Sequence, residues 1–311
     1  MGIRVLKGGM MTTVQDLGRT GYQSQGFSVS GVMDVRLFKI ANLLLDNPEN
    51  EAVLEFTLIG PTLEFTSETI ISITGGDFRP QINGKPAKMY TAIYMHRGDI
   101  LTFGGARTGT RGYIAFSSYL DVPVVMGSRS TNIKCQIGGY KGRKLEDEDY
   151  IAFRAKRRYL PYYLSRSLDL DEFDQEKITL RVVMGPQEKM FTKEGRETFL
   201  NSEYTVTSEF DRMGCRLEGP FIAYKTTSDI ISDGIAFGSV QVPSHGKPII
   251  LLADRQTTGG YAKIATVVSV DIPKLVQRKT EQKVRFQAVS VEEAQKLLAD
   301  EMKELNDFRS Q

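Results

Sequence analysis

The sequence has no tryptophan, and only two of its 311 residues are cysteines and two are histidines. The cysteines, Cys135 and Cys215, do not form a CxxC pair, so neither a disulfide nor a zinc site is predicted, and no metal ligand is assigned. We expect two reduced thiols, with Cys215 a small apolar residue of the core.

Two catalytic motifs are missing as well. The glycine-rich run 138–144 does not have the GxxxxGK[ST] spacing of a phosphate-binding loop, and no GxSxG is present. These absences argue against a self-sufficient ATPase of the P-loop type and against a serine hydrolase. A complete reaction is therefore expected to need groups from another chain.

Strong net charge and long apolar runs are also lacking. The formal net charge of +2 is too small to predict a nucleic-acid or membrane surface. No apolar run approaches the length of a membrane span, and the first residues lack the basic and apolar stretches of a secretory signal. We expect a cytoplasmic protein that binds neither nucleic acid nor a membrane.

Short apolar stretches bounded by turn residues dominate the chain. Residues 69–74 and 113–116 are rich in Ile, Phe, Tyr and Thr and adjoin glycines, a pattern typical of strands. Asn83-Gly84 has the composition of a two-residue hairpin turn. Many short strands with regular turns predict a mainly β protein built from barrels or sandwiches.

Two segments have helical periodicity. Residues 34–46 place apolar side chains on one face, and Asp34 is a suitable N-cap. Near the C-terminus, Ser290 and Glu293 form a capping box ahead of apolar residues at helical spacing. We interpret both apolar stripes as core packing.

The predicted domain boundary lies in residues 154–176, where a basic cluster is followed by an acidic one. Charge runs of this kind between strand-rich regions are typical of a solvated linker. We therefore predict an N-terminal β-barrel domain over residues 1–165 and a C-terminal β-barrel domain with a terminal helix over residues 166–311.

Four segments carry more polar side chains and glycines than a packed β structure needs. They are residues 12–22, 127–139, 210–217 and 240–261. In the last, a buried strand over residues 249–253 runs directly into Asp254-Arg255-Gln256-Thr257-Thr258, and Gly259-Gly260 are expected to let the backbone turn sharply or approach a ligand. A rigid strand that positions polar groups is what a binding site requires.

The segment Ser128-Arg129-Ser130-Thr131 offers hydroxyls and a guanidinium, a combination that suits a carboxylate or phosphate. Ordinary turn chemistry is the alternative interpretation of each of these segments. On the functional interpretation, Arg129 and Asp254 are expected to face one cavity that holds a small anion.

The same segments resemble the biotin-dependent carboxyltransferase-like family over nearly the whole chain. This family includes the C subunit of 5-oxoprolinase, KipA-type antagonists of a kinase inhibitor, allophanate hydrolase subunit 2 and a domain of urea carboxylase. The resemblance lies in these pieces: Thr13-Val14-Gln15-Asp16-Leu17-Gly18-Arg19, Ala41-Asn42-Leu43-Leu44, Gly127-Ser128-Arg129-Ser130-Thr131, Asp211-Arg212-Met213-Gly214, Gln241-Val242-Pro243 and Asp254-Arg255-Gln256-Thr257-Thr258-Gly259-Gly260-Tyr261.

The resemblance implies two cyclophilin-like β-barrel domains with a few short helices. It also implies a hydrolase complex with two partner proteins, one of the KipI type and one of the LamB/YcsF type, which uses ATP to open 5-oxoproline to glutamate. The location of the ATP site is left open. Two alternatives remain: a KipA-type regulatory protein that binds and antagonises a KipI-type inhibitor, and a carboxyltransferase-like protein that acts on an amide such as urea with biotin held on another chain.

The resemblance, together with the polar segments, gives a set of expected site residues. The expected catalytic residues are Asp254 or Asp16 as base or water-orienting group, and Arg129 as the group that binds the substrate carboxylate. The expected substrate-binding residues are Gln15, Arg19, Ser128, Ser130, Thr131, Gln241, Arg255, Gln256, Thr257, Thr258, Gly259, Gly260 and Tyr261.

The sequence departs from the family pattern at three glycine-containing turns. A Gly-Gly pair is replaced by Ser118-Tyr119, a Gly-Asp turn by Glu148-Asp149, and a Pro-Gly turn by Lys279-Thr280-Glu281. We expect the last two changes to be absorbed by other loop conformations. Side chains at the first are expected to narrow a nearby pocket.

Overall fold

The computed structural model describes residues 1–155, 160–169, 173 and 175–309. The chain forms two compact units, each of which also takes a short segment from another part of the sequence. The first comprises Met1–Thr20, Ser30–Asp174 and Leu305–Gln311, and the second Gly21–Val29 and Gln175–Glu304. Part of the linker predicted over residues 154–176, namely 156–159, 170–172 and 174, lies outside the described residues.

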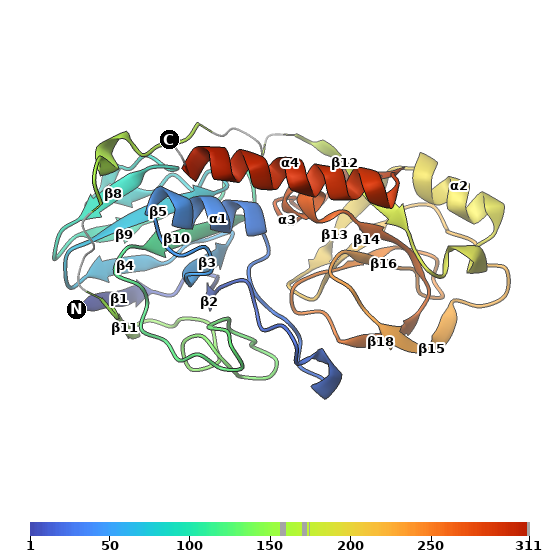
Figure 1. The fold of residues 1–311 in the computed structure, drawn as a ribbon, viewed down its shortest axis with the longest axis horizontal. Coiled ribbons are helices and arrows are strands. Elements are labelled where there is room, and N and C mark those ends of the chain that lie inside the picture. Colours follow the sequence, from blue (N-terminus) through green and yellow to red (C-terminus); the bar gives the residue numbers. More distant parts are fainter. Residues whose placement is uncertain (156–159, 170–172, 174, 310–311) are drawn as a thin grey trace. The chain divides into compact units, whose positions relative to one another are not determined.

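The first unit contains two sheets (Figure 1). One has six strands in the order β11 (Tyr150–Ala152), β1 (Gly2–Lys7), β4 (Thr62–Phe65), β9 (Ile100–Thr102), β6 (Gln81–Ile82), β7 (Lys85–Pro86). The other has five, in the order β2 (Met11–Gln15), β3 (Val53–Thr57), β10 (Arg111–Phe116), β5 (Thr69–Gly75), β8 (Ala92–Met95). Side chains from both sheets share one apolar cluster, so the unit is a β structure closed around a single core.

Helix α1 (Val35–Leu44) covers the outer face of the five-stranded sheet. Asp34 caps it by accepting a hydrogen bond from the Leu37 N–H at 2.9 Å, as predicted. Its apolar face packs with Tyr113 of β10 and Ile70 of β5 in a second buried cluster. The core-packing interpretation is therefore confirmed for this helix.

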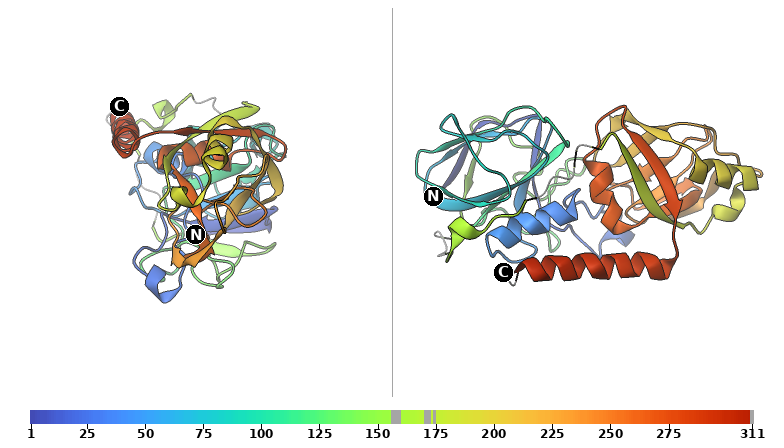
Figure 2. Two further views of the ribbon diagram at one scale, coloured as in Figure 1. Left: turned by 90° about the vertical axis from the view of Figure 1, so that its right-hand side faces the viewer. Right: turned by 90° about the horizontal axis from the view of Figure 1, so that it is seen from above.

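The second unit contains a closed seven-stranded barrel (Figure 2). Its strands follow the order β12 (Lys177–Met184), β19 (Lys263–Val267), β16 (Ser239–Gln241), β17 (Ile249–Leu251), β14 (Gly214–Glu218), β13 (Tyr204–Phe210), β20 (Lys283–Ala288). A separate two-stranded ribbon pairs β15 (Asp229–Gly234) with β18 (Thr258–Tyr261). The prediction of a mainly β protein with few helices is confirmed, and so is Cys215 as a fully buried core residue.

The remaining helices are α2 (Lys193–Asn201), α3 (Ile272–Val276) and α4 (Val291–Arg309). In α4, the predicted cap is present, since the Glu293 N–H donates to Ser290 Oγ at 3.1 Å. Core packing holds for Leu305, which joins the apolar cluster of α1, but is wrong for three other residues of the stripe. These exposed residues are Val291, Leu298 and Met302. Helical periodicity finds the apolar stripe of a helix, but it does not show how much of the stripe is covered.

The Asn83-Gly84 hairpin is confirmed, with φ of +51° and +77° at its two central residues. Two of the three family turns without glycine behave differently from our expectation. Tyr119, Glu148 and Glu281 have φ of +56°, +68° and +74°, so each keeps the left-handed conformation that glycine favours. The expectation that other loop conformations would absorb the changes at Glu148 and Glu281 is therefore wrong.

Replacement of Glu281 by glycine is expected to stabilise the protein. A non-glycine residue in the left-handed conformation lowers the free energy of unfolding by roughly 1–2 kcal/mol. Glycine removes this cost, but its greater backbone entropy in the unfolded chain cancels part of the gain. Urea denaturation of Glu281→Gly should show a gain of up to about 1 kcal/mol in the free energy of unfolding. Glu209→Gly, on an exposed position of β13, is the matched control and should lose about 0.5–1 kcal/mol. A loss of stability in both variants would contradict the assignment of strain to Glu281.

Candidate functional site

In the first unit, two loops that are more than a hundred residues apart in sequence are joined by backbone and side-chain hydrogen bonds. The Thr131 N–H donates to the Val14 carbonyl at 2.9 Å, and the Asp16 N–H donates to Ser130 Oγ at 3.0 Å. The end of β2 and the loop around Arg129 are thereby fixed side by side. We call this group of residues, Gln15, Asp16, Arg19, Ser128, Arg129, Ser130 and Thr131, the Asp16 cluster.

The carboxylate of Asp16 lies at the centre of this cluster and is 2% exposed. Its Oδ1 accepts hydrogen bonds from the hydroxyls of Ser128 and Ser130, each at 2.6 Å, and from the Gly18 N–H at 2.8 Å. Its Oδ2 accepts the Arg129 N–H at 2.6 Å. Four donors therefore contact this buried carboxylate, three on Oδ1 and one on Oδ2. The geometry therefore favours Asp16 as the residue that positions Arg129 over the predicted role of base.

The hydroxyls of this cluster face inward. Ser128 and Ser130 donate to Asp16, and Thr131 Oγ1 donates to the Val14 carbonyl at 2.9 Å. The predicted carboxylate-binding role of these hydroxyls is therefore not favoured. Arg129 is different, because its Nε is buried without a hydrogen-bond partner among the described residues.

Arg19 and two glycines complete the cluster. Arg19 is 1% exposed, and its guanidinium donates to the Ser130 carbonyl. A Cβ on Gly139 would overlap Thr131 Oγ1, and one on Gly138 would overlap the Ser130 carbonyl. Close approach to the Arg129 loop thus requires glycine at both positions. Gln15 donates to Thr13 Oγ1 and to the Thr131 carbonyl, at 3.0 and 3.1 Å.

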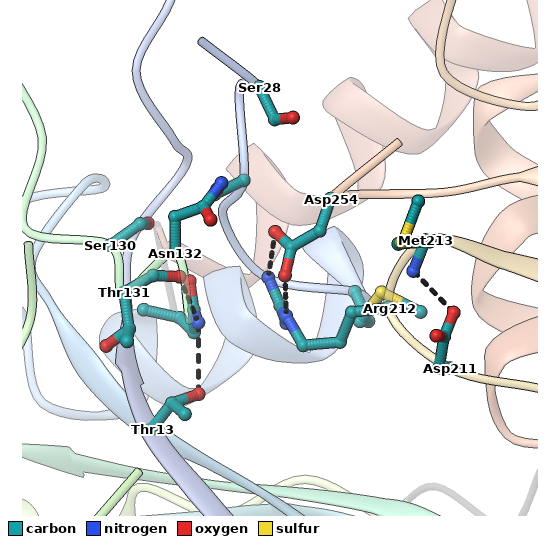
Figure 3. Close-up of polar contacts among 12 residues, drawn as sticks. Thr13, Ser28, Ser130, Thr131, Asn132, Asp211, Arg212, Met213 and Asp254 are labelled. Atoms are coloured by element: carbon teal, nitrogen blue, oxygen red, sulfur yellow. Dashed lines mark hydrogen bonds and ion pairs between the residues drawn. The ribbon is translucent and has the colours of Figure 1, made fainter. Parts of the chain in front are cut away.

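In the second unit, Asp254 forms a nearly buried ion pair with Arg212 (Figure 3). The Arg212 Nε–H donates to Oδ2 at 2.8 Å and Nη2–H to Oδ1 at 3.2 Å, and the two side chains are 10% and 12% exposed. The guanidinium takes one acceptor position on each oxygen, so both oxygens retain capacity for a further donor. Asp254 therefore has the acceptor capacity of a substrate-binding group.

Backbone pairing places these two side chains opposite each other. Beyond the β14–β17 ladder, Leu252 N–H donates to the Met213 carbonyl and Asp254 N–H to the Arg212 carbonyl, at 2.9 and 2.8 Å. Asp211 closes the preceding turn by accepting the Met213 N–H at 2.7 Å (Figure 3). It also accepts the Gly214 N–H at 3.1 Å. Arg212 was not among the predicted site residues, although its segment belongs to the family motifs, because strand adjacency was unknown.

Arg255 was predicted to bind substrate, but its guanidinium is used inside the second unit. It is 7% exposed and donates to the carbonyls of Ile235 and Leu252, at 3.0 and 3.1 Å. Burial lowers the pKa of Arg255. Ser28 donates to the Arg255 carbonyl at 2.7 Å, a contact that no sequence motif indicates. These contacts favour a structural role for Arg255.

The expected sharp turn at Gly259-Gly260 is wrong, because Thr258–Tyr261 form strand β18, and neither glycine has a positive φ. A Cβ on Gly259 would lie 2.6 Å from the Ile235 side chain and 2.7 Å from Gln241 Nε2. Gly259 is thus needed for close packing against Gln241, which donates to the Tyr261 carbonyl at 3.3 Å. Gln256, Thr258 and Tyr261 are exposed and Thr257 is half-buried, so all four are accessible to a ligand.

A buried lysine at the start of β19 was not predicted from the sequence. The side chain of Lys263 is 5% exposed, and its ammonium donates to Asp233 Oδ2 at 2.7 Å and to the Gly234 carbonyl at 3.1 Å. This ion pair lowers the pKa of Asp233. Gln187 accepts the Lys263 N–H at 3.2 Å. The contacts fasten the β15–β18 ribbon to the barrel. The preceding residues, Tyr261 and Ala262, do not indicate from the sequence that Lys263 is buried.

The structure thus brings together the predicted residues of each unit separately. Arg129 belongs to the first unit and Asp254 to the second, and the expected common cavity stays a prediction. Among the described residues, no group of His, Cys, Asp and Glu side chains is arranged to hold a metal ion. No helix within the described ranges is both long and apolar enough to cross a bilayer.

Comparison with known proteins identifies the family. Residues 25–288 match the family of the carboxyltransferase domain, subdomain A and B. The chain belongs to this family. The matched span contains the Arg129 loop, Arg212 and Asp254 but begins after residues 15–19 of the Asp16 cluster. The family predicted from the sequence motifs is confirmed.

Two relatives match over nearly their full length. The chain is 33% identical to the 5-oxoprolinase C subunit of Escherichia coli, with 97% of this chain and 96% of that protein covered. It is 34% identical to the 5-oxoprolinase C subunit of Haemophilus influenzae, with 92% and 90% covered. Among solved structures, Kluyveromyces lactis urea carboxylase is 29% identical to this chain, with a TM-score of 0.91. The match covers 99% of this chain but only 29% of the urea carboxylase chain.

Replacement of Asp16 by asparagine is expected to destabilise the protein. The asparagine amide presents N–H donors to groups that are themselves donors, so buried hydrogen bonds are lost. Urea denaturation of Asp16→Asn should show a loss of roughly 2–4 kcal/mol. Asp121→Asn, at an exposed position, should change stability by less than about 0.5 kcal/mol. Equal stability of both variants would contradict the structural role of Asp16.

The Arg212–Asp254 pair can be tested by a double-mutant cycle. Arg212→Met leaves a nearly buried carboxylate without its cation and should cost about 3 kcal/mol of unfolding free energy. The double variant Arg212→Met/Asp254→Leu removes both charges and should lose less than Arg212→Met alone. A loss in the double variant equal to the sum of the losses in Arg212→Met and Asp254→Leu would show that the two charges do not interact.

Proposed function

We propose that the chain is the C subunit of an ATP-dependent 5-oxoprolinase, a complex that opens 5-oxo-L-proline to L-glutamate. The observation that carries the proposal is the match in length to the C subunits of two 5-oxoprolinases, since this chain covers 96% of one and 90% of the other. A protein named as one subunit of an enzyme has partners. In the proposal these are one protein of the KipI type and one of the LamB/YcsF type.

The chemistry to be performed is demanding, because resonance stabilises the lactam. Transfer of the ATP γ-phosphoryl group to the amide oxygen, with ADP as leaving group, makes the ring carbon a better electrophile. Water then attacks this carbon, the carbon–nitrogen bond breaks, and the nitrogen takes up a proton. Hydrolysis of the resulting acyl phosphate releases phosphate and the new carboxylate. In the proposal, ATP is a substrate of the assembled complex, and no residue of this chain is assigned to it.

Asp254 is the residue of the second unit to which we assign a role. The ion pair with Arg212 fixes its orientation, and its remaining acceptor positions suit the lactam N–H or an attacking water. A fixed acceptor of this kind lowers the barrier because the hydrogen bond requires no reorganisation during the reaction. Recognition of the substrate carboxylate is the role proposed for Arg129, whose buried Nε has unused donor capacity among the described residues.

A second candidate function is carboxyl transfer to an amide such as urea. It is favoured by the likeness to Kluyveromyces lactis urea carboxylase, with a TM-score of 0.91. The sequence has no Met-Lys-Met motif, so a biotin carrier would come from another chain. The small share of that enzyme covered by this chain, 29%, makes this the second choice.

The proposal is tested with the full chain mixed with the proteins encoded beside it. The mixture should release glutamate from 5-oxoproline only with ATP, and Asp254→Asn should lower kcat by about a hundredfold or more. Asp121→Asn should retain wild-type turnover, and thermal denaturation should show both variants folded. A KipA-type regulatory protein would give no glutamate, and a carboxyltransferase would instead transfer the carboxyl group of a carboxybiotin carrier to urea and release the carrier with free biotin. Wild-type turnover by Asp254→Asn would remove Asp254 from the reaction.

A further inference from the structure

A cavity of about 520 Å³ lies beside the β6–β7 hairpin in the first unit. Its lining residues include Pro80, Pro86, Ala87, Met89 and Tyr90. Its volume falls in the range of small-molecule sites, and a mainly apolar wall with a few polar groups is their usual lining. None of its lining residues belongs to the Asp16 cluster.

Arg79 lines this cavity, and its guanidinium has no carboxylate partner among the described residues. Among the described residues, Arg79 has one long hydrogen bond, from Nη2 to the Gly105 carbonyl at 3.4 Å, and no ion pair. The neighbouring Asp77 is already engaged, since Oδ1 accepts the Arg79 N–H at 3.0 Å and Oδ2 lies 3.7 Å from Arg107. Asp77 and Arg79 both line the cavity, and Arg107 beside Asp77 makes the sum of these three charges one positive charge.

The backbone holds Arg79 in a conformation that costs free energy. Arg79 has a φ of +47°, in the left-handed region. The segment is fixed on both sides of Arg79, because the Gly104 N–H donates to the preceding Phe78 carbonyl at 2.8 Å and the Ala87 N–H donates to the following Pro80 carbonyl at 2.9 Å. A strained non-glycine residue that its surroundings hold in place is typical of ligand sites. A second cavity of about 290 Å³ also has Arg79 among its lining residues.

Tyr90, another lining residue of the cavity, is held in place by hydrogen bonds of its hydroxyl. The Tyr90 hydroxyl donates to the Gly75 carbonyl and accepts the Gly75 N–H, the latter at 3.2 Å. Tyr90, whose hydroxyl is held in this way, is one of the residues that line the cavity. This lining residue is thus fixed before a ligand binds.

We infer that this cavity binds a small amphipathic carboxylate, with the anion on Arg79 and an apolar ring or chain against Met89 and Tyr90. Charge complementarity selects an anion, and the apolar wall excludes one that is fully hydrated, such as acetate. The inference does not depend on the proposed enzymatic function, because it involves other residues and a different test.

The test is binding of 3-phenylpropionate to the isolated full-length chain, followed by calorimetry and ligand-observed NMR. The neutral 3-phenylpropionamide lacks the anion and acetate lacks the apolar body, so both should bind at least about tenfold more weakly. Arg79→Gln should weaken binding of 3-phenylpropionate by about tenfold or more. The matched control Arg97→Gln, at an exposed position between β8 and β9, should leave affinity unchanged.

A second variant addresses the apolar wall. Ala87→Trp fills the cavity and should abolish binding, with an unchanged circular dichroism spectrum showing that the fold persists. If that variant does not fold, Arg79→Gln decides alone, because the exposed Arg79 side chain can change without loss of core packing. Absence of saturable binding at millimolar concentration, or equal affinity of wild type and Arg79→Gln, would overturn the inference.

Discussion

The need to fill the lone pairs of a buried carboxylate organises the first unit around Asp16. Its four hydrogen bonds join the end of β2 to the loop of Arg129, two segments that the sequence separates by more than a hundred residues. Loss of one donor would leave an unpaired acceptor in a site where water has no access. Arg129 is therefore held by a network in which each member depends on the others.

In the second unit, the nearly buried carboxylate of Asp254 is held by an ion pair with Arg212. Arg212 and Asp254 belong to segments that continue the β14–β17 ladder, so the backbone aligns them before the side chains interact. The pair leaves acceptor capacity on both oxygens of Asp254, whereas the carboxylate of Asp16 is 2% exposed and already accepts four donors. Two aspartates that the sequence presented as equivalent candidates thus have different chemical capacities, and the difference comes entirely from their partners.

Local features of the fold could be predicted from the sequence, whereas features that depend on strand order could not. The Asp34 cap and the Asn83-Gly84 hairpin follow from neighbouring residues and were correct. The partnership of Arg212 with Asp254 depends on which strands are adjacent, and no short motif specifies this. The left-handed conformation of Glu281 is set by its surroundings against its own preference, so the residue type was misleading.

The ribbon of β15 and β18 stands apart from the hydrogen-bonded circle of the barrel. An isolated pair of strands is only marginally stable, so its anchors, the Lys263–Asp233 ion pair and the Gln241–Tyr261 hydrogen bond, decide how often it opens. Amide hydrogens on this ribbon should therefore exchange with solvent by local opening while those of the barrel remain protected. The accessible side chains of Thr258 and Tyr261 are carried on an element that can rearrange around a small molecule at little cost to the barrel.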